Sequence, residues 1–494
     1  MTRLVLGPFN RVEGDLEVQL EVSDGHVVEA RVNAPLYRGF EGLMAGRDAM
    51  DALTIAPRIC GICSVSQSVA AAKALADAAG IEPAPNGQRA INLMLACENL
   101  ADHLTHFYLF FMPDFTRPHY VARPWFAEAT RRFAAVAGAA AGGAHNAAVL
   151  AARLRWLELM GALAGKWPHT GAILPGGSSR AIETPERVRL SARVREMRGF
   201  LERTLFGGPL EQVAALDSLA ALDAWRERAP ASDLALFLEI AADSSLASLG
   251  AGPGRYLSYG AYAQPQGGHA LARGVWDSRL QLMEPLDARG ISEDMRYAWM
   301  EEGEQGLPLH PAVGITRPSP DKEAAYTWNK APRLNGLVVE TGAISRQMVD
   351  GQPLIRAAVA RHGATVYTRV LARLMELARI LPMMEQWLMQ LEQHEPFHRA
   401  EPLPKEGSGA GLSEAARGAL GHWVRIENGR IAHYQIVAPT SWNFSPRDTG
   451  GVPGALEAAL VGAPVEADAR GRGQSVAVQH IVRSFDPCMV CTVH

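Results

Sequence analysis

The chain has 494 residues, of which 48% are hydrophobic and 20% charged, and its formal net charge is −4. This composition is ordinary for a folded protein with a large core, and it excludes the basic surface that binds nucleic acid. No run of eighteen or more apolar residues is present and the N-terminus lacks a signal-peptide core, so we expect no membrane span. A cytoplasmic location follows, unless a signal-bearing partner carries the chain across a membrane.

Two β-hairpins are predicted, one near each end of the chain. In each, two segments of strand-like sequence flank a turn with Asp-Gly or Asn-Gly, the dipeptides typical of short hairpin loops. The segments are 15–22 and 26–32 around Asp24-Gly25, and 423–426 and 430–437 around Asn428-Gly429. We expect both hairpins to share one small sheet region that gathers the two chain ends.

The chain between the hairpins is predicted to be mainly helical. Segments rich in Ala and Leu, with apolar residues at helical spacing, are 64–80, 87–112, 124–165, 183–206 and 354–394. A break in the last of these is expected at Pro382. Residues 245–335, rich in Gly, Pro and aromatic residues, are predicted to be an irregular insertion with short strands, and residues 395–411 a loop.

Two Cys-x-x-Cys pairs stand at opposite ends of the chain, Cys60 with Cys63 and Cys488 with Cys491. Four thiolates from two such turns can close on one metal and tie the C-terminus to the N-terminal region. Zinc, an iron–sulfur cluster, copper and nickel are all compatible with the pairs alone, although structural zinc sites usually take their pairs from nearby residues. The fifth cysteine, Cys97, lies in an apolar segment and is expected to be a buried, inert thiol.

These features predict an α+β fold that is predominantly helical. A central bundle of long helices is expected, with small β-hairpin regions near both chain ends that converge on a buried metal site. The whole chain, 1–494, is expected to be one domain. Its parts are an N-terminal β region (1–40), a helical bundle (41–240), the irregular insertion (245–335), the long helix (354–394) and a C-terminal β and metal-site region (411–494).

Further motifs follow one another from end to end of the chain. They are Asn10-Arg11-Val12-Glu13-Gly14, Arg38-Gly39-Phe40-Glu41, the first cysteine pair, Asp102-His103 with His106-Phe107-Tyr108, Pro175-Gly176-Gly177, Ala416-Arg417-Gly418-Ala419, Pro439-Thr440-Ser441-Trp442-Asn443 and Asp486-Pro487-Cys488. In this order they resemble the large subunit of [NiFe]-hydrogenases. The resemblance is greatest to the H2-sensing regulatory branch, which is related to the uptake enzymes.

The resemblance implies the ligands of two metal sites. Four cysteines would bind nickel, with Cys60 and Cys488 as terminal ligands and Cys63 and Cys491 as bridges to an iron that carries carbon monoxide and cyanide. A magnesium site near the C-terminus would be formed by Glu41, the carbonyl of Ile436 and His494. The expected reaction is heterolytic splitting of H2, in which a thiolate takes the proton.

The resemblance also implies roles for residues around the metals. Glu13 matches a proton-transfer glutamate. Arg417 matches an arginine placed over the open metal position, and Asp102 and Asp486 match the carboxylates that hold it. The residues expected beside the ligands of the iron are Thr440, whose hydroxyl would bond a cyanide, Pro439 and Ala416. Without the resemblance, Glu13 also fits a surface charge, Asp102 a solvated helix residue and His494 a disordered tail residue.

Three features depart from the family pattern. Gln67 stands four residues after Cys63, where many members carry a histidine; its amide can donate a hydrogen bond to the Cys63 sulfur but cannot carry a proton. Ala416 replaces a proline that often precedes the arginine, which is expected to loosen the backbone. The chain ends at His494, either because an extension is removed after metal insertion or because none is encoded.

Gln67 and the missing extension predict a regulatory hydrogenase, which cleaves H2 at a low rate and signals hydrogen availability to a histidine kinase. The alternative is a catalytic uptake hydrogenase that feeds electrons from H2 to a respiratory chain. A metal-free structural homologue is a third class, and the four intact cysteines argue against it. Because no cysteine remains for an electron-relay cluster, we expect an iron–sulfur small subunit as partner, in a heterodimer or a dimer of heterodimers.

Overall fold

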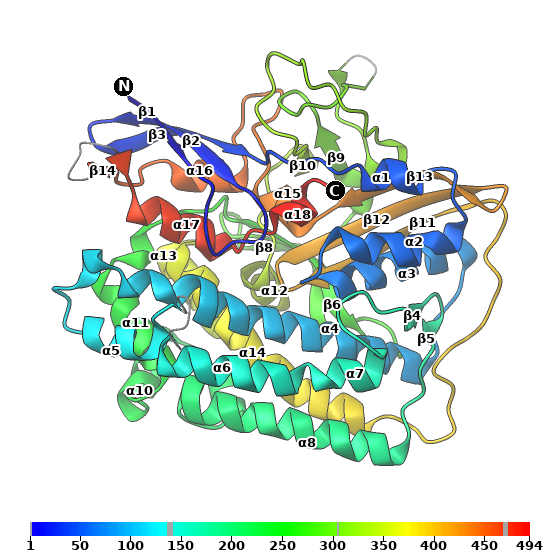
Figure 1. Cartoon of the computed structure of the whole chain (residues 1–494), viewed down its shortest axis with the longest axis horizontal. Helices are drawn as coiled ribbons and strands as arrows, with labels where there is room; N and C mark the ends of the chain where they lie inside the picture. The colour runs from blue at the N-terminus through cyan, green and yellow to red at the C-terminus, as the bar shows by residue number, and fades with distance from the viewer. Residues whose placement is uncertain (1, 136–141, 304–305, 468–472) are drawn as a thin grey trace.

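The computed structural model describes residues 2–135, 142–303, 306–467 and 473–494. A bundle of helices lies around α4 (Pro85–Thr105) and α14 (Val366–Met389), and small sheets lie to one side of the bundle (Figure 1). α4 and α14 pack against each other and are buried along most of their length, so they form the centre of the main hydrophobic core. The predicted fold, α+β and predominantly helical, is confirmed.

The helices vary from one turn to more than six turns in length. They are α1 (Phe40–Met44), α2 (Ala52–Ile55), α3 (Ser64–Ala79), α4, α5 (Phe126–Phe133), α6 (Ala144–Trp156), α7 (Glu158–Ala164), α8 (Thr184–Phe200), α9 (Leu210–Ala214), α10 (Leu219–Arg228), α11 (Asp233–Asp243), α12 (Ala343–Asp350), α13 (Pro353–His362), α14, α15 (Pro439–Asn443), α16 (Ala455–Leu460), α17 (Val476–Phe485) and α18 (Met489–Thr492). Helices α4 and α8 each continue into a π-helical segment, His106–Phe111 and Leu201–Phe206. The predicted helical segments 64–80, 87–112 and 183–206 therefore match the structure.

The strands form small antiparallel sheets. They are β1 (Thr2–Leu6), β2 (Glu17–Ser23) and β3 (His26–Asn33); β4 (Ile173–Leu174) and β5 (Gly177–Ser178); β6 (Arg255–Ala263), β7 (His269–Asp277) and β8 (Leu282–Glu284); β9 (Ile291–Asp294) and β10 (Ala331–Leu334); β11 (Gly407–Ala415), β12 (Gly418–Glu427) and β13 (Arg430–Val437); and β14 (Glu466–Ala467) and β15 (Gly473–Gln474). Among the described residues, no helix has the length and apolar character needed to cross a bilayer.

Both predicted hairpins are present, but they belong to different sheets. Their turns have left-handed backbone at Asp24 (φ 52°) and Gly25 (φ 75°), and at Asn428 (φ 53°) and Gly429 (φ 74°), as the turn dipeptides predict. The expectation of one shared sheet is wrong, because β1–β2–β3 and β11–β12–β13 are separate. Each hairpin gains its third strand from a neighbouring segment instead, β1 beside β2 and β11 beside β12.

Strand β11 begins inside the segment 395–411 that the sequence predicts to be a loop. Its glycines face helix α3 at very short range: a Cβ on Gly411 would lie 1.9 Å from the Ala70 carbonyl oxygen, and one on Gly409 would lie 2.3 Å from that of Ala74. The loop prediction is wrong over 407–411 because these glycines permit close packing of a strand on a helix. The β11–β12–β13 sheet thereby supports α3, which begins beside the first cysteine pair.

The predicted long helix 354–394 is two helices, and its break is not at Pro382. Helix α13 ends at Gly363 (φ 76°), and α14 starts after Thr365, whose side chain and that of Thr368 form a capping box. Pro382 lies within α14, where it removes one backbone hydrogen bond. Leu381 and Met384 beside it are fully buried, and this packing keeps the helix continuous.

Two other predicted segments match in part. Residues 124–165 contain α5, α6 and α7 in place of one long helix, and residues 136–141 lie outside the described residues. Residues 245–335 are largely irregular, as expected. However, β6 and β7 each span nine residues and pair along most of their length, so these strands are longer than the sequence suggests.

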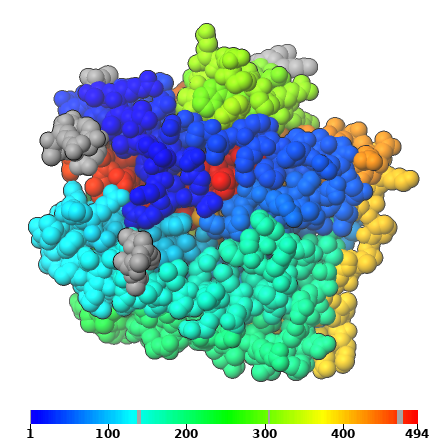
Figure 2. All heavy atoms as spheres, viewed as in Figure 1, coloured from blue at the N-terminus to red at the C-terminus, as the bar shows by residue number. Residues whose placement is uncertain are grey.

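The C-terminus lies near the centre of the molecule, beside α18, whereas the N-terminus lies at the outer end of β1 (Figure 1). In the space-filling view, a small patch of C-terminal residues is visible between segments of the N-terminal region (Figure 2). The backbone link is specific, since Glu13 pairs with Cys488 in a parallel bridge. The fold therefore brings the segments that carry the two cysteine pairs together.

Candidate metal centre

The four paired cysteines converge on one point. Their sulfur atoms all lie within 4.8 Å of one another, with Sγ–Sγ distances of 3.5 Å for Cys60–Cys488 and 2.9 Å for Cys63–Cys491. All four are buried and none forms a disulfide. Sulfurs bound tetrahedrally to one metal would be about 3.8 Å apart. The spacing, burial and softness of these donors therefore fit a thiolate-bound metal centre.

The thiols share their charge unequally. Hydrogen bonds from the other three thiols hold the pKa of Cys60 well below its usual value, whereas the same contacts and burial raise the pKa of Cys63. Burial also raises the pKa of Cys488 and of Cys491. Cys60 therefore favours the thiolate form, and the other three cysteines favour the protonated thiol. Binding of a cation to all four sulfurs would release the protons of these thiols.

The loop that carries Glu13 lies directly against the second cysteine pair. The Glu13 N–H donates to the Pro487 carbonyl (3.4 Å), and the Met489 N–H donates to the Glu13 carbonyl (2.7 Å). Gly14 has a φ of 80°, and a Cβ there would lie 3.0 Å from the Val490 nitrogen, so only glycine fits. Burial and Cys60 raise the pKa of the half-buried Glu13 carboxyl, and Arg417 partly offsets this effect.

Arg38 connects the two cysteine loops. Its guanidinium donates to the Ile59 carbonyl (2.6 Å), immediately before Cys60, and to the Val490 carbonyl, immediately before Cys491. Sequence reasoning places Arg38 in a motif but assigns it no partner. The motif was the available signal, and the two carbonyls could not be identified from it because they are remote in the chain.

Glu98 is a residue beside the site that sequence reasoning missed. Its buried carboxylate, on α4, accepts hydrogen bonds from the N–H groups of Val65 (2.8 Å) and Ser66 (2.9 Å), in the first turn of α3. Cys63 occupies the N-cap position of α3 and makes no side-chain cap bond, so Glu98 provides the cap. Burial raises the pKa of Glu98 to about 7, although these hydrogen bonds act to lower the pKa. A carboxylate one turn before Asp102 in an apolar helix was the available signal.

The structure brings Arg417, Asp102 and Asp486 together in the interior. Arg417 Nη1 lies 3.0 Å from Asp102 Oδ2, and Nη2 lies 3.3 Å from Asp486 Oδ1. Nε donates to the Asp486 carbonyl (2.9 Å). Burial lowers the pKa of Arg417, but the two carboxylates and the thiols of Cys488 and Cys60 outweigh it and raise the pKa well above its usual value. Arg417 is therefore a fixed cation beside the sulfur cluster.

Gln67 binds a histidine, not a thiol. Its Oε1 atom accepts a hydrogen bond from His422 Nε2 (2.8 Å), and His422 Nδ1 lies 2.8 Å from the Tyr434 hydroxyl. Gln67 Nε2 is buried and has no hydrogen-bond partner among the described residues. The hydrogen bond to the Cys63 sulfur that the sequence suggests is thus not formed within the described part of the chain. His422 is a second residue that sequence reasoning missed.

The three residues expected beside the iron are buried next to the cysteines or the Arg417 turn. Thr440 Oγ1 accepts a hydrogen bond from the Cys488 N–H (3.1 Å). Pro439 is the first residue of α15, and its carbonyl accepts from the Thr341 hydroxyl (3.4 Å). The Ala416 carbonyl accepts from Arg346 (3.0 Å). Since Thr440 uses its oxygen as acceptor, its hydroxyl proton remains available to a ligand.

Glu41, Ile436 and His494 meet around a cavity of about 20 Å³. His494 Nε2 lies 3.2 Å from Glu41 Oε1 and 3.0 Å from the Ile436 carbonyl oxygen. Burial raises the pKa of Glu41, but Lys330 and His494 outweigh it and lower the pKa to about 2. An ionised carboxylate and a carbonyl are donors that suit a hard divalent cation, with the imidazole as third donor.

Comparisons with known proteins match the whole length of the chain. The sequence model of a family described as nickel-dependent hydrogenase matches residues 38–142 and 125–494. The chain is 28% identical to the periplasmic [NiFeSe] hydrogenase large subunit of Desulfomicrobium baculatum and 26% identical to the uptake hydrogenase large subunit of Rubrivivax gelatinosus. Each alignment covers 100% of this chain and 95% of the relative. Hydrogenase-1 large chain of Escherichia coli is 27% identical with the same coverage.

Solved structures show the same likeness. The Ni-Fe-Se hydrogenase from D. vulgaris Hildenborough in the reduced state aligns with a TM-score of 0.82 at 29% identity. The reduced, active Ni-Fe-Se hydrogenase from Desulfomicrobium baculatum aligns with a TM-score of 0.84 at 27% identity. Both alignments cover 100% of this chain and 100% of the other.

Proposed function

Because the chain belongs to the nickel-dependent hydrogenase family as a large subunit, we propose that it is the catalytic subunit of an uptake hydrogenase. In this function it oxidises H2 and passes the electrons to a respiratory chain. Support comes from the curated relatives, which include uptake hydrogenase large subunits and are matched across the whole of this chain. They favour this alternative over the regulatory function that the sequence analysis predicts.

The convergence of the four buried cysteines beside Glu13 and Arg417 is the observation that carries the proposal. Cys60 and Cys488 would hold nickel, and Cys63 and Cys491 would bridge it to an iron with carbon monoxide and cyanide ligands. This centre, when bound, supplies the heterolytic splitting of H2.

The protein groups around the cluster then handle the proton and the local field. Glu13 is half-buried, and its raised pKa suits a carboxylate that takes a proton from a cysteine and releases it outward. Arg417 is held by two carboxylates, so its charge stays in one place and needs no reorganisation during the reaction. The Thr440 hydroxyl donates to no other described residue, so its proton would orient a ligand of the iron.

Further parts of the proposal concern the second metal, the partner and the location. Glu41, the Ile436 carbonyl and His494 would bind Mg²⁺. The small cavity beside them would limit the number of waters that the ion keeps. The electrons would leave through an iron–sulfur small subunit in a heterodimer, as large-subunit relatives support. The cytoplasmic location stays a prediction.

Infrared spectroscopy of the purified complex tests the proposal. We expect carbon monoxide and cyanide stretching bands from the ligands of the iron. We also expect about one nickel per chain, because the four thiolates form one metal site. A Cys488→Ser variant should lose both the bands and the nickel. Cys97→Ser is the matched control, because Cys97 is a buried thiol whose sulfur, within the described residues, donates a hydrogen bond to the Trp156 carbonyl and does not join the cysteine cluster. Wild-type protein with nickel but without the bands would contradict the proposal.

Hydrogen sensing is a second candidate, and Gln67 is the observation that favours it. An amide bound to His422 cannot relay protons in the way that an imidazole does. If sensing is the function, Gln67→His should raise H2 oxidation about tenfold or more. An unchanged rate in Gln67→His, with high turnover in the wild type, would support the uptake function.

A further inference from the structure

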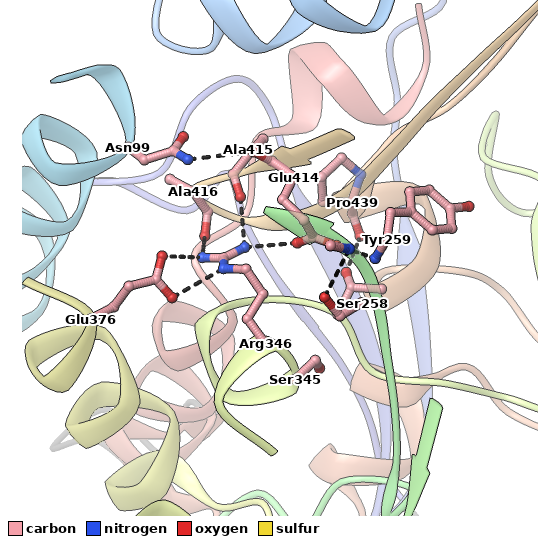
Figure 3. A network of polar contacts seen from close by, with 12 residues as sticks. Asn99, Ser258, Tyr259, Ser345, Arg346, Glu376, Glu414, Ala415, Ala416 and Pro439 are labelled. Carbon is pink, nitrogen blue, oxygen red and sulfur yellow. Dashed lines mark hydrogen bonds and ion pairs between the residues drawn. The ribbon is translucent and has the colours of Figure 1, made fainter. Parts of the chain in front are cut away.

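A buried ion-pair cluster lies against the backbone of Ala415 and Ala416, immediately before Arg417 in the chain (Figure 3). At its centre, Arg346 of α12 donates from Nε and Nη2 to the two oxygens of Glu376 (3.0 and 2.8 Å). Nη1 donates to Glu414 Oε2 (2.9 Å) and to the Ala415 carbonyl (2.8 Å), and Nη2 donates to the Ala416 carbonyl (3.0 Å). All five N–H donors of this guanidinium are therefore used.

The turn itself has an unusual backbone. Ala415 pairs with Gly418, so Ala416 and Arg417 are the two residues of a hairpin loop between β11 and β12. Such loops are normally stabilised by positive φ angles at one or both central residues. In this turn, positive φ occurs at Gly418 (128°) and not at Ala416 or Arg417. The turn thus lacks the usual local stabilisation, and Arg346 binds its carbonyls from outside.

The same cluster reaches the other support of Arg417. Glu376 of α14 also accepts a hydrogen bond from His103 Nε2 (3.2 Å), and His103 follows Asp102, which binds Arg417. Glu414 Oε1 accepts from the Tyr259 N–H (2.7 Å), which fixes this carboxylate against β6. The backbone before Arg417 and the helix that carries Asp102 are therefore connected through one guanidinium.

We propose that Arg346 is a positioning residue for Arg417, which it holds beside the four cysteines by binding the carbonyls of Ala415 and Ala416. The inference deepens the proposed function and rests on it, because it assumes that Arg417 acts beside the metal centre. A buried guanidinium keeps all five bonds because a buried donor without a partner is costly. Each bond therefore resists movement of the turn.

Arg346→Lys tests the proposal, because an ammonium has three donors and cannot reproduce the planar set of five bonds. The matched control is Arg333→Lys. Arg333 is also buried and binds Asp448. Its other hydrogen-bond partners are Ser445 and the carbonyls of Pro332, Pro446 and Val452, none of which belongs to the turn that carries Arg417. Any general effect of replacing a buried arginine is then measured separately.

The first measurement uses the full chain before metal insertion. We expect amide hydrogen exchange at Ala416 and Arg417 to become about tenfold faster in Arg346→Lys, and to be unchanged in Arg333→Lys. Glu414→Gln is measured in parallel, because its amide oxygen cannot serve both Arg346 and Tyr259 fully. A smaller increase at the same two residues is expected. Unchanged exchange in both Arg346→Lys and Glu414→Gln, or an equal increase in Arg333→Lys, would overturn the proposal.

The second measurement uses the metal-loaded complex. Arg346→Lys should shift the carbon monoxide and cyanide infrared bands and lower kcat with little change in KM for H2, because Arg417 moves while the metal ligands stay. Ala416→Pro in the Arg346→Lys background should restore the bands and kcat, since Ala415 is already extended, as a residue before proline must be. Bands identical to wild type in Arg346→Lys would overturn the proposal. Complete absence of bands in the wild type, with the exchange result intact, would contradict the proposed function alone.

Discussion

Glu13 and Arg417 carry opposite charges beside the same sulfur atoms, and each is held by a different kind of contact. The Glu13 backbone pairs with the second cysteine loop, whereas its carboxyl forms no hydrogen bond or ion pair with the described residues. Arg417 is locked by two carboxylates. A group that exchanges protons needs this freedom and a group that supplies a fixed field needs the restraint.

Glu13→Gln should lower H2 oxidation by about a hundredfold or more, because an amide cannot accept a proton. The carbon monoxide and cyanide bands should remain, since Glu13 is not a metal ligand in the proposed centre. Asp15→Asn, two residues away and exposed, is the matched control and should keep full activity. A Glu13→Gln variant with wild-type turnover would show that protons leave by another route.

At the scale of elements, the site depends on how α3 is held on both sides. Glu98 of α4 caps its first turn, and the glycines of β11 let the sheet approach its backbone. Cys63 and Gln67 are the N-cap residue and a first-turn residue of this helix, so a shift of α3 would move both. The element that looks like a plain Ala-rich helix in sequence is therefore a rigid support for the first cysteine pair.

Gly411→Ala should destabilise the protein by about 1–3 kcal/mol and reduce bound nickel, because the new methyl group would overlap the Ala70 carbonyl oxygen. Thermal unfolding and metal analysis measure the two effects. Gly42→Ala is the matched control, since a Cβ on Gly42 would meet nothing within 4 Å. Equal stability of the two variants would show that the contact between β11 and α3 is not tight in solution.

Glu457 gives a pH dependence to the docking of α16 on β3. Its Oε1 accepts from the Val32 N–H (3.0 Å) and the Tyr326 hydroxyl (2.7 Å), and burial raises its pKa to about 7. Because the folded pKa lies above the unfolded value, the folded state binds the proton more tightly between the two. This contribution to stability is complete below a pH of about 4.5 and is lost as the pH rises to about 7.

Glu457→Gln should therefore gain stability relative to wild type as the pH rises through that window, by up to about 3 kcal/mol. Free energies of unfolding from denaturant titrations at about pH 5 and about pH 8 measure the change. The exposed Glu82→Gln is the control, and its difference from wild type should be the same at both pH values. Parallel pH profiles for Glu457→Gln and wild type would contradict the assignment.

At the scale of the whole molecule, segments from the N-terminal and C-terminal parts of the chain meet at two neighbouring sites. Arg38 binds both cysteine loops, and His494 contacts Glu41 and the Ile436 carbonyl. The interior of the molecule is therefore completed only when the last residues are in place. Binding of cations at these sites would stabilise the closed arrangement by mass action.

His494→Ala should abolish most of the bound magnesium and remove the response of the thermal midpoint to added Mg²⁺. For the wild type, a hundredfold excess of Mg²⁺ over its dissociation constant would add about 2.7 kcal/mol. Metal analysis and thermal unfolding measure both effects. The control is His433→Ala on β13, whose ring contacts the Pro311 carbonyl away from this cavity. A wild-type midpoint that does not respond to Mg²⁺ would contradict the proposed site.

Local patterns in the sequence determined the features that depend on neighbours in the chain. The Asp-Gly and Asn-Gly turns predict the two hairpins, helical periodicity predicts α3, α4 and α8, and the cysteine pairs predict a shared metal site. The tertiary structure alone decided the rest, because the partners involved lie far apart in sequence. The glycines of β11 predict a loop from the sequence, whereas in the structure they allow β11 to pack closely against α3. Pro382 predicts a break, whereas in the structure its buried neighbours keep α14 continuous. Likewise, Arg38, Glu98 and Arg346 acquire their roles through carbonyls and N–H groups of remote segments, and no local pattern encodes those hydrogen bonds.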